Sequence, residues 1–309
     1  MKPLRIGSRG SALALWQATF VRRELEHAGI ASEIVIIKTT GDAAPDAPIP
    51  GIGVKGVFIK ELEDALLDGR VDMAVHSMKD VPTAIPRGLA FPAICRRHDP
   101  RDAVVSRSGA GLRDLAKGAR VGTSSVRRQA QLRAARPDLD FADLRGNVDT
   151  RLRKLDSGAY DAIVLARAGL DRLGLSHRIS EVIPTDTCLP AVGQGAIGVE
   201  TRASDEAACA AVARLDHRET RLAIETERAL LAFLEGGCQA PLGALATVDG
   251  NRLLVEGCVA SLDGRQVVRD VLDGATSQPE NLGQRLGAML LSKGAEGILA
   301  RARRAAGDA

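Results

Sequence analysis

The sequence predicts an α/β protein with two α/β domains and a smaller α+β domain at the C-terminal end. The chain has 309 residues, of which 45% are hydrophobic, and this length exceeds the roughly 100–200 residues of one ordinary domain. Short apolar runs alternate with amphipathic helical runs as far as residue 165, and such alternation is typical of largely parallel sheets with crossover helices. From residue 252 onward strand patterns follow one another directly, which indicates antiparallel strands.

The first α/β unit begins with a predicted strand at residues 4–7. Ser11 is suited to cap the helix that follows, and Gly29 is suited to end it. Residues 41–56 are rich in Gly, Pro and Asp, so we expect a loop there, and its length is typical of a functional loop. The unit also contains two more predicted strands and one helix, at residues 34–38, 71–75 and 58–67.

A second α/β unit begins near Asp102. Its predicted strands lie at residues 103–106, 120–122 and 161–165, and its predicted helices at residues 125–135 and 147–157. The Gly-rich segment 189–200 then marks a boundary. The α+β domain is predicted from a helix, two strands and a final helix, at residues 220–234, 252–260, 266–272 and 281–305.

The composition argues against several classes of protein. The net charge is only +3 and aromatic residues make up 2% of the chain, so the surface field and the stacking platforms of a nucleic-acid-binding protein are not expected. We find neither a signal-peptide pattern nor the roughly 18–20 apolar residues that span a bilayer. The five cysteines are scattered without a CxxC pair, and we see no convincing metal-ligand spacing. We therefore expect a cytoplasmic protein with no metal site, no membrane partner and no nucleic-acid partner.

Arginine and hydroxyl residues gather where predicted strands end, and they indicate a site for an acidic small molecule. In open α/β sheets, ligands bind at the carboxyl ends of strands. Arg127 and Arg128 stand in the first turn of a predicted helix, where a positive charge opposes the helix dipole, so a bound anion is a natural explanation. The alternative is a set of surface arginines paired with Asp143 and Asp149. The candidate residues are Arg9, Ser11, Thr123, Ser125, Arg127, Arg128, Arg145 and Arg151.

A second kind of cluster follows the predicted strand at residues 71–75. His76, Lys79 and Asp80 place an imidazole, a base and an acid within five positions. Asp80 could stabilise a developing cation, or it could simply cap a turn before Pro82.

Cys238 differs from the other four cysteines in its surroundings. It follows Gly236 and Gly237 and precedes Pro241, so it belongs to a loop that an electrophile can reach. The alternative is an inert cysteine, which is the commoner case. We expect the core role for Cys95, Cys188, Cys209 and Cys258.

Several separated motifs resemble the porphobilinogen deaminase (hydroxymethylbilane synthase) family along nearly the whole chain. They occur in the order RIGSRGSALALWQA, KGVFIKELE, DMAVHSMKDVP, VGTSSVRRQAQL, LRGNVDTRLRKLDSGAYDAIVLA, LPAVGQGAIGVE and LEGGCQAPLG. The resemblance implies a transferase that condenses four porphobilinogen molecules head to tail, with release of ammonia, into hydroxymethylbilane. It also implies a monomer, and a transient hand-over of the product to the next enzyme of the tetrapyrrole pathway.

The resemblance assigns roles to matched residues. Cys238 would carry a dipyrromethane cofactor through a thioether, and Asp80 would be the catalytic carboxylate with Lys79 beside it. Lys55 and Phe58 would belong to a cover over the site, and Gln194 and Gly195 to the region of the domain hinge. The residues that would bind acetate and propionate groups are Arg9, Ser11, Lys79, Thr123, Ser125, Arg127, Arg128, Arg145, Arg151 and Arg172.

The resemblance also implies how the domains are arranged. Two α/β domains similar to periplasmic binding proteins would flank a cleft, and the third, α+β domain would carry the cofactor. We expect domain 1 at residues 1–99 and 196–216, domain 2 at residues 100–195, and domain 3 at residues 217–309.

The chemistry of this reaction suits the candidate residues. Loss of ammonia from porphobilinogen leaves an electrophile whose positive charge is spread over a pyrrole ring, and a carboxylate at the pyrrole N–H stabilises that charge. Each added ring brings two carboxylates, which arginine forks bind and orient. Two rival interpretations are a solute-binding module and a cysteine hydrolase that uses Cys238 with a histidine.

Overall fold

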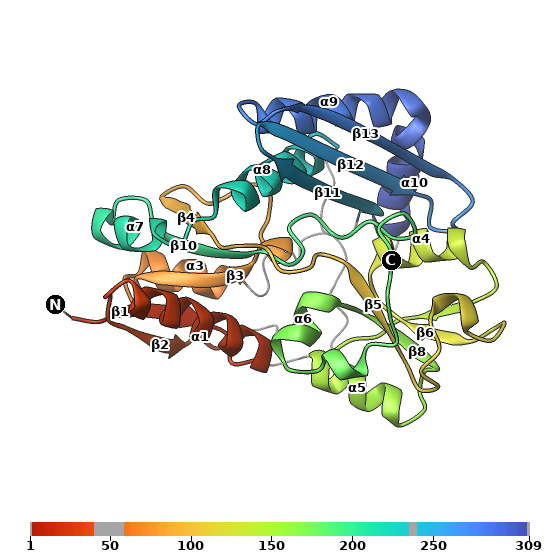
Figure 1. Cartoon of the computed structure of the whole chain (residues 1–309), viewed down its shortest axis with the longest axis horizontal. Helices are drawn as coiled ribbons and strands as arrows, with labels where there is room; N and C mark the ends of the chain where they lie inside the picture. Colours follow the sequence, from red (N-terminus) through yellow and green to blue (C-terminus); the bar gives the residue numbers. More distant parts are fainter. Residues whose placement is uncertain (1, 40–58, 235–239, 308–309) are drawn as a thin grey trace.

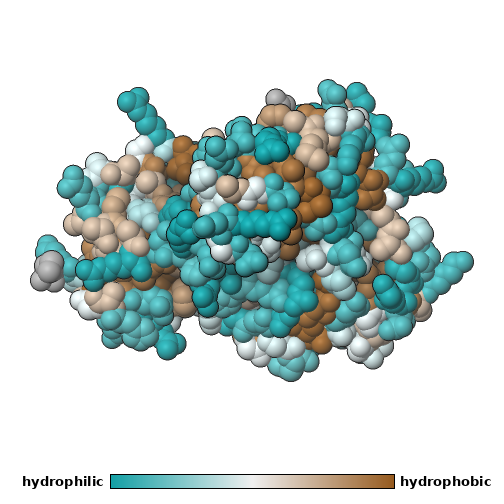
Figure 2. Space-filling model, turned by 45° about the horizontal axis from the view of Figure 1, so that its top comes forward, coloured by the Kyte–Doolittle hydropathy of each residue, from teal (hydrophilic) through white to brown (hydrophobic). Residues whose placement is uncertain are grey.

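Three β-sheets with their helices make up the computed structural model, which describes residues 2–39, 59–234 and 240–307 (Figure 1). The third sheet lies above the other two in Figure 1. The surface face in Figure 2 is mostly hydrophilic, with hydrophobic side chains in scattered patches. No helix within these ranges is both long enough and apolar enough to cross a lipid bilayer.

The first sheet has the strand order β2-β1-β3-β10-β4. Strands β1, β2 and β3 are parallel, as predicted, while β10 runs antiparallel to both of its neighbours, β3 and β4. Residues 189–200, which the sequence suggested as a boundary segment only, thus supply most of a central strand. The five strands are β1 (Leu4–Ser8), β2 (Ser32–Ile36), β3 (Met73–Ser77), β4 (Leu89–Ile94) and β10 (Ile197–Arg202).

Helices α1, α3 and α7 pack against this sheet. The Ser11 side chain accepts a hydrogen bond from the backbone N–H of Ala14 at 3.4 Å, which confirms the predicted cap, and the chain turns at Gly29 with a φ of 76°. Ile6, Val21 and Leu25 are fully buried between helix and sheet. The helices span α1 (Ala12–His27), α3 (Lys60–Leu67) and α7 (Glu206–Ala213).

The second sheet has the strand order β7-β6-β8-β5-β9, and β5 is antiparallel to both of its neighbours. Its strands are β5 (Asp102–Ser106), β6 (Arg120–Gly122), β7 (Asp140–Ala142), β8 (Ala162–Ala166) and β9 (Glu181–Val182). Its helices are α4 (Val126–Ala135), α5 (Val148–Asp156) and α6 (Arg167–Arg172), with short 3-10 turns at Leu112–Asp114 and Ser176–Arg178.

The third sheet is the antiparallel meander β11-β12-β13, covered by α8 and α9. Leu230, Leu253, Leu286 and Leu290 are fully buried between them. The single helix predicted at residues 281–305 is wrong, because a π-helical turn at Leu291–Ala295 and a φ of 101° at Gly294 divide it. The elements are α8 (Arg218–Phe233), β11 (Leu242–Asp249), β12 (Arg252–Ala260), β13 (Val267–Ala275), α9 (Pro279–Leu290) and α10 (Glu296–Gly307).

Two crossover segments, residues 95–101 and 184–196, connect the first sheet with the second. They bond to each other, because the His98 N–H donates to the Gly195 carbonyl at 3.1 Å and the Gln194 side chain donates to the Pro100 carbonyl at 2.6 Å. The chain therefore passes between the two α/β parts through one paired connection that includes Gln194 and Gly195.

Candidate active site

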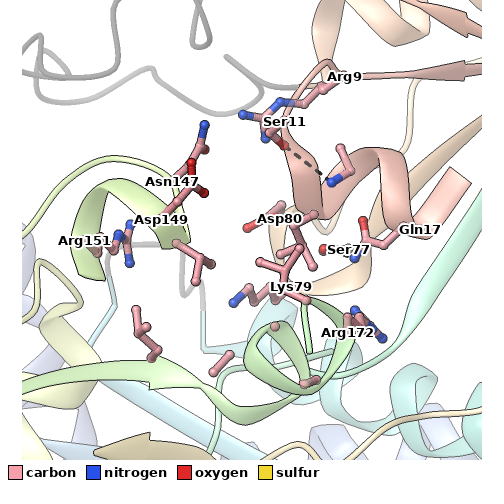
Figure 3. Close-up of a pocket in the computed structure, with 18 of the residues that line it drawn as sticks. Arg9, Ser11, Gln17, Ser77, Lys79, Asp80, Asn147, Asp149, Arg151 and Arg172 are labelled. Carbon is pink, nitrogen blue, oxygen red and sulfur yellow. Dashed lines mark hydrogen bonds between the residues drawn. The ribbon is translucent and has the colours of Figure 1, made fainter. Parts of the chain in front are cut away.

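A cavity of about 280 Å³ opens where the first sheet faces the second. Its wall comes from the N-terminus of α1, the turn after β3, the N-terminus of α5, and α6 (Figure 3). Seven of the twelve predicted site residues line it: Arg9, Ser11, Lys79, Asp80, Arg128, Arg151 and Arg172.

Lys79 and Asp80 belong to a 3-10 turn, Met78–Asp80, which we call the Asp80 turn. Both side chains point toward the α5 side of the cavity in Figure 3. Asp80 is exposed at the cavity and accessible to a ligand. Lys79 is half-buried at the cavity wall, and desolvation lowers the pKa of Lys79 to about 8 although the neighbouring Asp80 opposes the shift. The turn thus presents an accessible carboxylate beside an amine that titrates close to neutral pH.

The Asp80 turn packs closely on two glycines, Gly193 in the second crossover segment and Gly198 in β10. A Cβ atom on Gly193, whose φ is 74°, would lie 2.9 Å from the Met78 carbonyl carbon and 3.0 Å from the Lys79 nitrogen. A Cβ atom on Gly198 would overlap the Met78 sulfur and lie 2.9 Å from the Phe91 ring. The Met78 N–H also donates to the Ala196 carbonyl at 3.0 Å. The position of Asp80 therefore depends on this close backbone packing.

Arg127 and Arg128 are both buried against one carboxylate, Asp102 at the start of β5. Arg127 Nη1 lies 2.7 Å from Asp102 Oδ2, and Arg128 donates through Nε and Nη2 to Oδ1 at 3.0 and 2.7 Å. The Gln194 side chain also donates to Oδ1, at 2.8 Å. Burial alone would raise the pKa of Asp102, but the two guanidinium groups outweigh it and hold that pKa well below its usual range. The expected anion at this helix N-terminus is thus present within the protein, and the suggested surface pairs with Asp143 and Asp149 are not the partners of these two arginines.

Arg151 and Arg172 bring further positive charge to the cavity. Burial lowers the pKa of each to about 10, and for Arg151 the nearby Arg128 acts in the same direction. Arg172 donates to the Gly195 carbonyl at 2.7 Å and lies over the Trp16 ring, 5.6 Å from its centroid. Its Nε is buried without a hydrogen-bond partner among the described residues. Such a buried and incompletely bonded guanidinium suits an anionic ligand.

Four predicted residues lie outside the lining of this cavity. Thr123 and Ser125 serve the turn before α4, where the Ser125 side chain accepts from the Arg128 N–H at 3.4 Å. Arg127 and Arg145 complete this set. Three further predictions, Cys238, Lys55 and Phe58, lie outside the described residues.

His76 faces away from the cavity although it precedes Lys79 by only three residues. Side chains alternate along a strand, so Ser77 faces α1 and accepts from Gln17 at 2.8 Å, while His76 pairs with buried Glu200 at 2.9 Å. Sequence reasoning missed Gln17, Asn147 and Asp149, which line the cavity (Figure 3). The N-terminal position of Asn147 and Asp149 on α5 was a usable signal for the last two.

The other cysteines are mostly buried, as predicted. Cys95, Cys188 and Cys258 are buried and Cys209 is half-buried. Burial raises the pKa of the Cys95 and Cys188 thiols to about 12 and that of Cys258 to about 11, which makes these thiols unreactive near neutral pH. Within the described ranges, no group of three or more His, Cys, Asp or Glu residues could hold a metal ion.

The donor set therefore fits a small ligand with several carboxylates. The guanidinium groups and Lys79 can bind its acidic arms, and Asp80 offers one carboxylate to its reacting part. The fold and the site together define an α/β cleft enzyme that acts on a small polycarboxylate.

Comparison with known proteins gives the particular family. Residues 4–210 match the family model described as "Porphobilinogen deaminase, dipyromethane cofactor binding domain", and residues 221–292 match "Porphobilinogen deaminase, C-terminal domain". A protein of Pelobacter propionicus named porphobilinogen deaminase is 51% identical over 300 residues, which cover 96% of each chain. The chain belongs to the porphobilinogen deaminase family. It is an enzyme that joins four porphobilinogen molecules head to tail, with release of ammonia, into hydroxymethylbilane, and it uses a dipyrromethane cofactor.

Similar solved structures share little sequence with this chain. A substrate-binding protein of an ABC transporter from Coxiella burnetii aligns with 69% of this chain and 91% of its own, at 15% identity and a TM-score of 0.43. A YaeC-family lipoprotein from Enterococcus faecalis aligns with 70% of this chain and 91% of its own, at 14% identity and a TM-score of 0.41.

Proposed function

We propose that Asp80 is the catalytic carboxylate of this reaction and that Lys79 and the cavity arginines hold the acidic arms of substrate and cofactor. The observation that carries the proposal is the cavity itself, in which the exposed Asp80 carboxylate stands among five cationic side chains, Arg9, Lys79, Arg128, Arg151 and Arg172, with Asp149 at the N-terminus of α5. A carboxylate that accepts a hydrogen bond from a pyrrole N–H stabilises positive charge on that ring.

The residues around Asp80 have separate tasks in this proposal. Arg151 on α5 and Arg172 on α6 approach the cavity from the second sheet, while Arg9 and Ser11 approach from the first. Acidic arms held from both sides fix the orientation of a ring against Asp80. Because the pKa of Lys79 is about 8, its Nζ can bind a carboxylate as a cation and can also exchange a proton near neutral pH.

The dipyrromethane cofactor supplies, when bound, the pyrrole carbon to which the first substrate is joined. We propose that Cys238 holds it through a thioether. The acidic arms would be held by Arg9, Ser11, Lys79, Arg128, Arg151 and Arg172 of the cavity, with Thr123, Ser125, Arg127 and Arg145 as further members of the set. The matched "cofactor binding domain" ends at residue 210 and includes all of these side chains but not Cys238. That match supports binding of the cofactor arms within the first two α/β parts.

We also propose the domain bounds 1–99 with 196–216, 100–195, and 217–309. The membership of the strands supports them, since β10 returns to the first sheet and β11 to β13 form a sheet of their own. The chain is proposed to act as a cytoplasmic monomer, without a membrane or nucleic-acid partner, and to hand its product transiently to the next enzyme of the tetrapyrrole pathway.

Intact-protein mass spectrometry tests the cysteine assignment. Wild-type protein should be heavier than its sequence by a two-pyrrole adduct, and Cys238→Ser should lack it. If the wild type has no adduct, incubation with porphobilinogen should add it. An adduct that persists in Cys238→Ser, or one that never forms, would contradict the assignment.

A second experiment tests Asp80. Asp80→Asn keeps the size and loses the charge, so porphobilinogen consumption should fall by at least about 100-fold while the cofactor adduct stays detectable by mass. Unchanged consumption by an adduct-bearing Asp80→Asn protein would refute the catalytic role.

A further inference from the structure

Helix α8, from the third domain, reaches the Asp80 turn through one arginine. The Arg228 guanidinium donates to three successive carbonyls: Nη1 to Val81 at 3.0 Å, and Nη2 to Pro82 at 2.5 Å and to Thr83 at 3.1 Å. These carbonyls belong to the three residues directly after Asp80, just beyond the C-terminal end of the Asp80 turn. One side chain thus satisfies the backbone that leads away from the catalytic carboxylate.

The preceding residue on α8 holds the other side of the same turn. Glu227 is fully buried and accepts from the Gly193 N–H at 2.8 Å, from the Ala246 N–H at 2.8 Å, and from both Nη atoms of Arg97. Gly193 is the residue whose Cα packs on the backbone of Met78 and Lys79. The Asp80 turn is therefore held between the backbone bound by Glu227 and the carbonyls bound by Arg228.

The elements that carry these contacts also flank Cys238 in the sequence. Helix α8 ends at Phe233 and β11 begins at Leu242, and Glu227 joins the two elements through the Ala246 N–H. Ile224, one turn before Arg228 on α8, is buried in a cluster with Met78 and Val81. The contact between the third domain and the Asp80 turn is thus both polar and apolar.

From these contacts we infer that Arg228 is a positioning residue, which fixes the Asp80 carboxylate from the third domain without touching the substrate. The inference rests on the proposed role of Asp80. A displaced catalytic group lowers the rate of the chemical step more than it weakens substrate binding. Loss of Arg228 should therefore appear in kcat and much less in KM.

Arg221 provides a matched control on the same helix. It stands two turns before Arg228 and also donates to carbonyls of the first domain, Phe91 at 3.1 Å and Pro92 at 2.9 Å. Those carbonyls belong to β4 and not to the Asp80 turn. Both arginines can therefore help to dock α8 on the first domain. Of the two, Arg228 binds the backbone next to Asp80 and can position that carboxylate.

The test compares Arg228→Met with Arg221→Met in the full-length holoenzyme, by steady-state porphobilinogen consumption and by thermal unfolding. Arg228→Met should lower kcat by at least about tenfold with KM changed by no more than about threefold. Arg221→Met should keep kcat within about twofold even where the two unfolding midpoints fall equally. Arg228→Lys, which keeps a donor and disturbs folding least, should recover part of kcat. Equal kcat values for the two methionine variants, or for Arg228→Lys and Arg228→Met, would overturn the inference.

Asp80→Asn separates this inference from the proposal on which it rests. In single-turnover assays, adding Arg228→Met to Asp80→Asn should lower the residual rate by no more than about twofold, because the positioned carboxylate is already lost. Full additivity of the two losses would overturn the positioning role. If Asp80→Asn alone turned over like the wild type, the proposed role of Asp80 would fail instead.

Discussion

Asp102 is expected to be essential for stability because it is the carboxylate on which two buried arginines depend. Asp102→Asn preserves the shape of the side chain and removes its charge. The wild-type carboxylate accepts from Arg127, Arg128 and Gln194 at distances of 2.7 to 3.0 Å, and it is fully buried. The variant leaves Arg127 and Arg128, which are only 5% and 6% exposed, without their counter-charge.

The size of the effect follows from that burial. Removing one partner of a buried ion pair destabilises a protein by about 3–5 kcal/mol, since an uncompensated charge remains. An unfolding entropy of about 2.1 cal/mol/K per residue over the 309 residues converts this loss into a fall of the unfolding midpoint by about 5–8 °C. Because the folded pKa of Asp102 lies below the unfolded value of about 3.9, its contribution is complete above about pH 5 and is lost as the pH falls below 4.

Differential scanning calorimetry at pH 7 and at pH 3.5 measures both effects. The matched control is Asp156→Asn, because Asp156 pairs with Arg178 at 2.6 Å but its side chain is 54% exposed, and exposed pairs contribute only about 0–1 kcal/mol. The difference between wild type and Asp102→Asn should be large at pH 7 and smaller at pH 3.5. If Asp102→Asn were no less stable than Asp156→Asn at pH 7, the reasoning from burial would be wrong.

Three further predictions concern the cavity and the Asp80 turn. KM for porphobilinogen should rise as the pH increases through about 8, where Lys79 loses its proton. Lys79→Arg should abolish that rise in a pH–rate profile. An identical profile for both proteins would exclude Lys79 as the cause of the rise in KM. Gly198→Ala should destabilise the protein by about 1–3 kcal/mol in urea titrations, because the added methyl group meets Met78 and Phe91. The control is Gly297→Ala on α10, where the nearest atom is 3.6 Å away, and this variant should be neutral or stabilising. Equal effects of the two substitutions would contradict the packing argument. Trp16 is the single tryptophan, and its ring centroid lies 5.6 Å from Cζ of Arg172. Its fluorescence should therefore change when the holoenzyme binds porphobilinogen, and a Trp16→Leu variant should have a KM higher by about two- to tenfold. An unchanged KM would refute the cation–π contribution.

Local signals were sufficient for the elements whose ends are set by nearby residues. The cap at Ser11 and the strands at residues 120–122 and 252–260 agree with their predictions. Strand β10 could not be predicted in this way, because the Gly-rich segment 189–200 indicated a loop and the partner strands β3 and β4 lie more than 100 residues earlier in the chain. Only tertiary pairing makes that segment a strand.

The candidate site shows the same division between local and distant causes. Position after a strand was enough to place Arg9, Ser11, Lys79 and Asp80 in one cavity. Arg127 and Arg128 at a helix N-terminus indicate a nearby anion, but the local sequence does not reveal that this anion is Asp102, some 25 residues away. The contact of Gln17 with Ser77 spans 60 residues and left no pattern that single-sequence reasoning can use.

The position of β10 has a consequence for how the protein emerges from the ribosome. Within the part of the chain that the structure describes, strand β4 pairs with the first sheet through β10 alone, and β10 is synthesised after the whole of the second sheet. The second sheet is formed by one continuous stretch, from Asp102 to Val182, and can fold as soon as that stretch is outside the ribosome. We therefore expect the N-terminal part to remain an incomplete sheet, with β3 and β4 exposing unpaired edges, until translation has passed Arg202. The second sheet would then be the first to complete its fold, although it comes second in the gene.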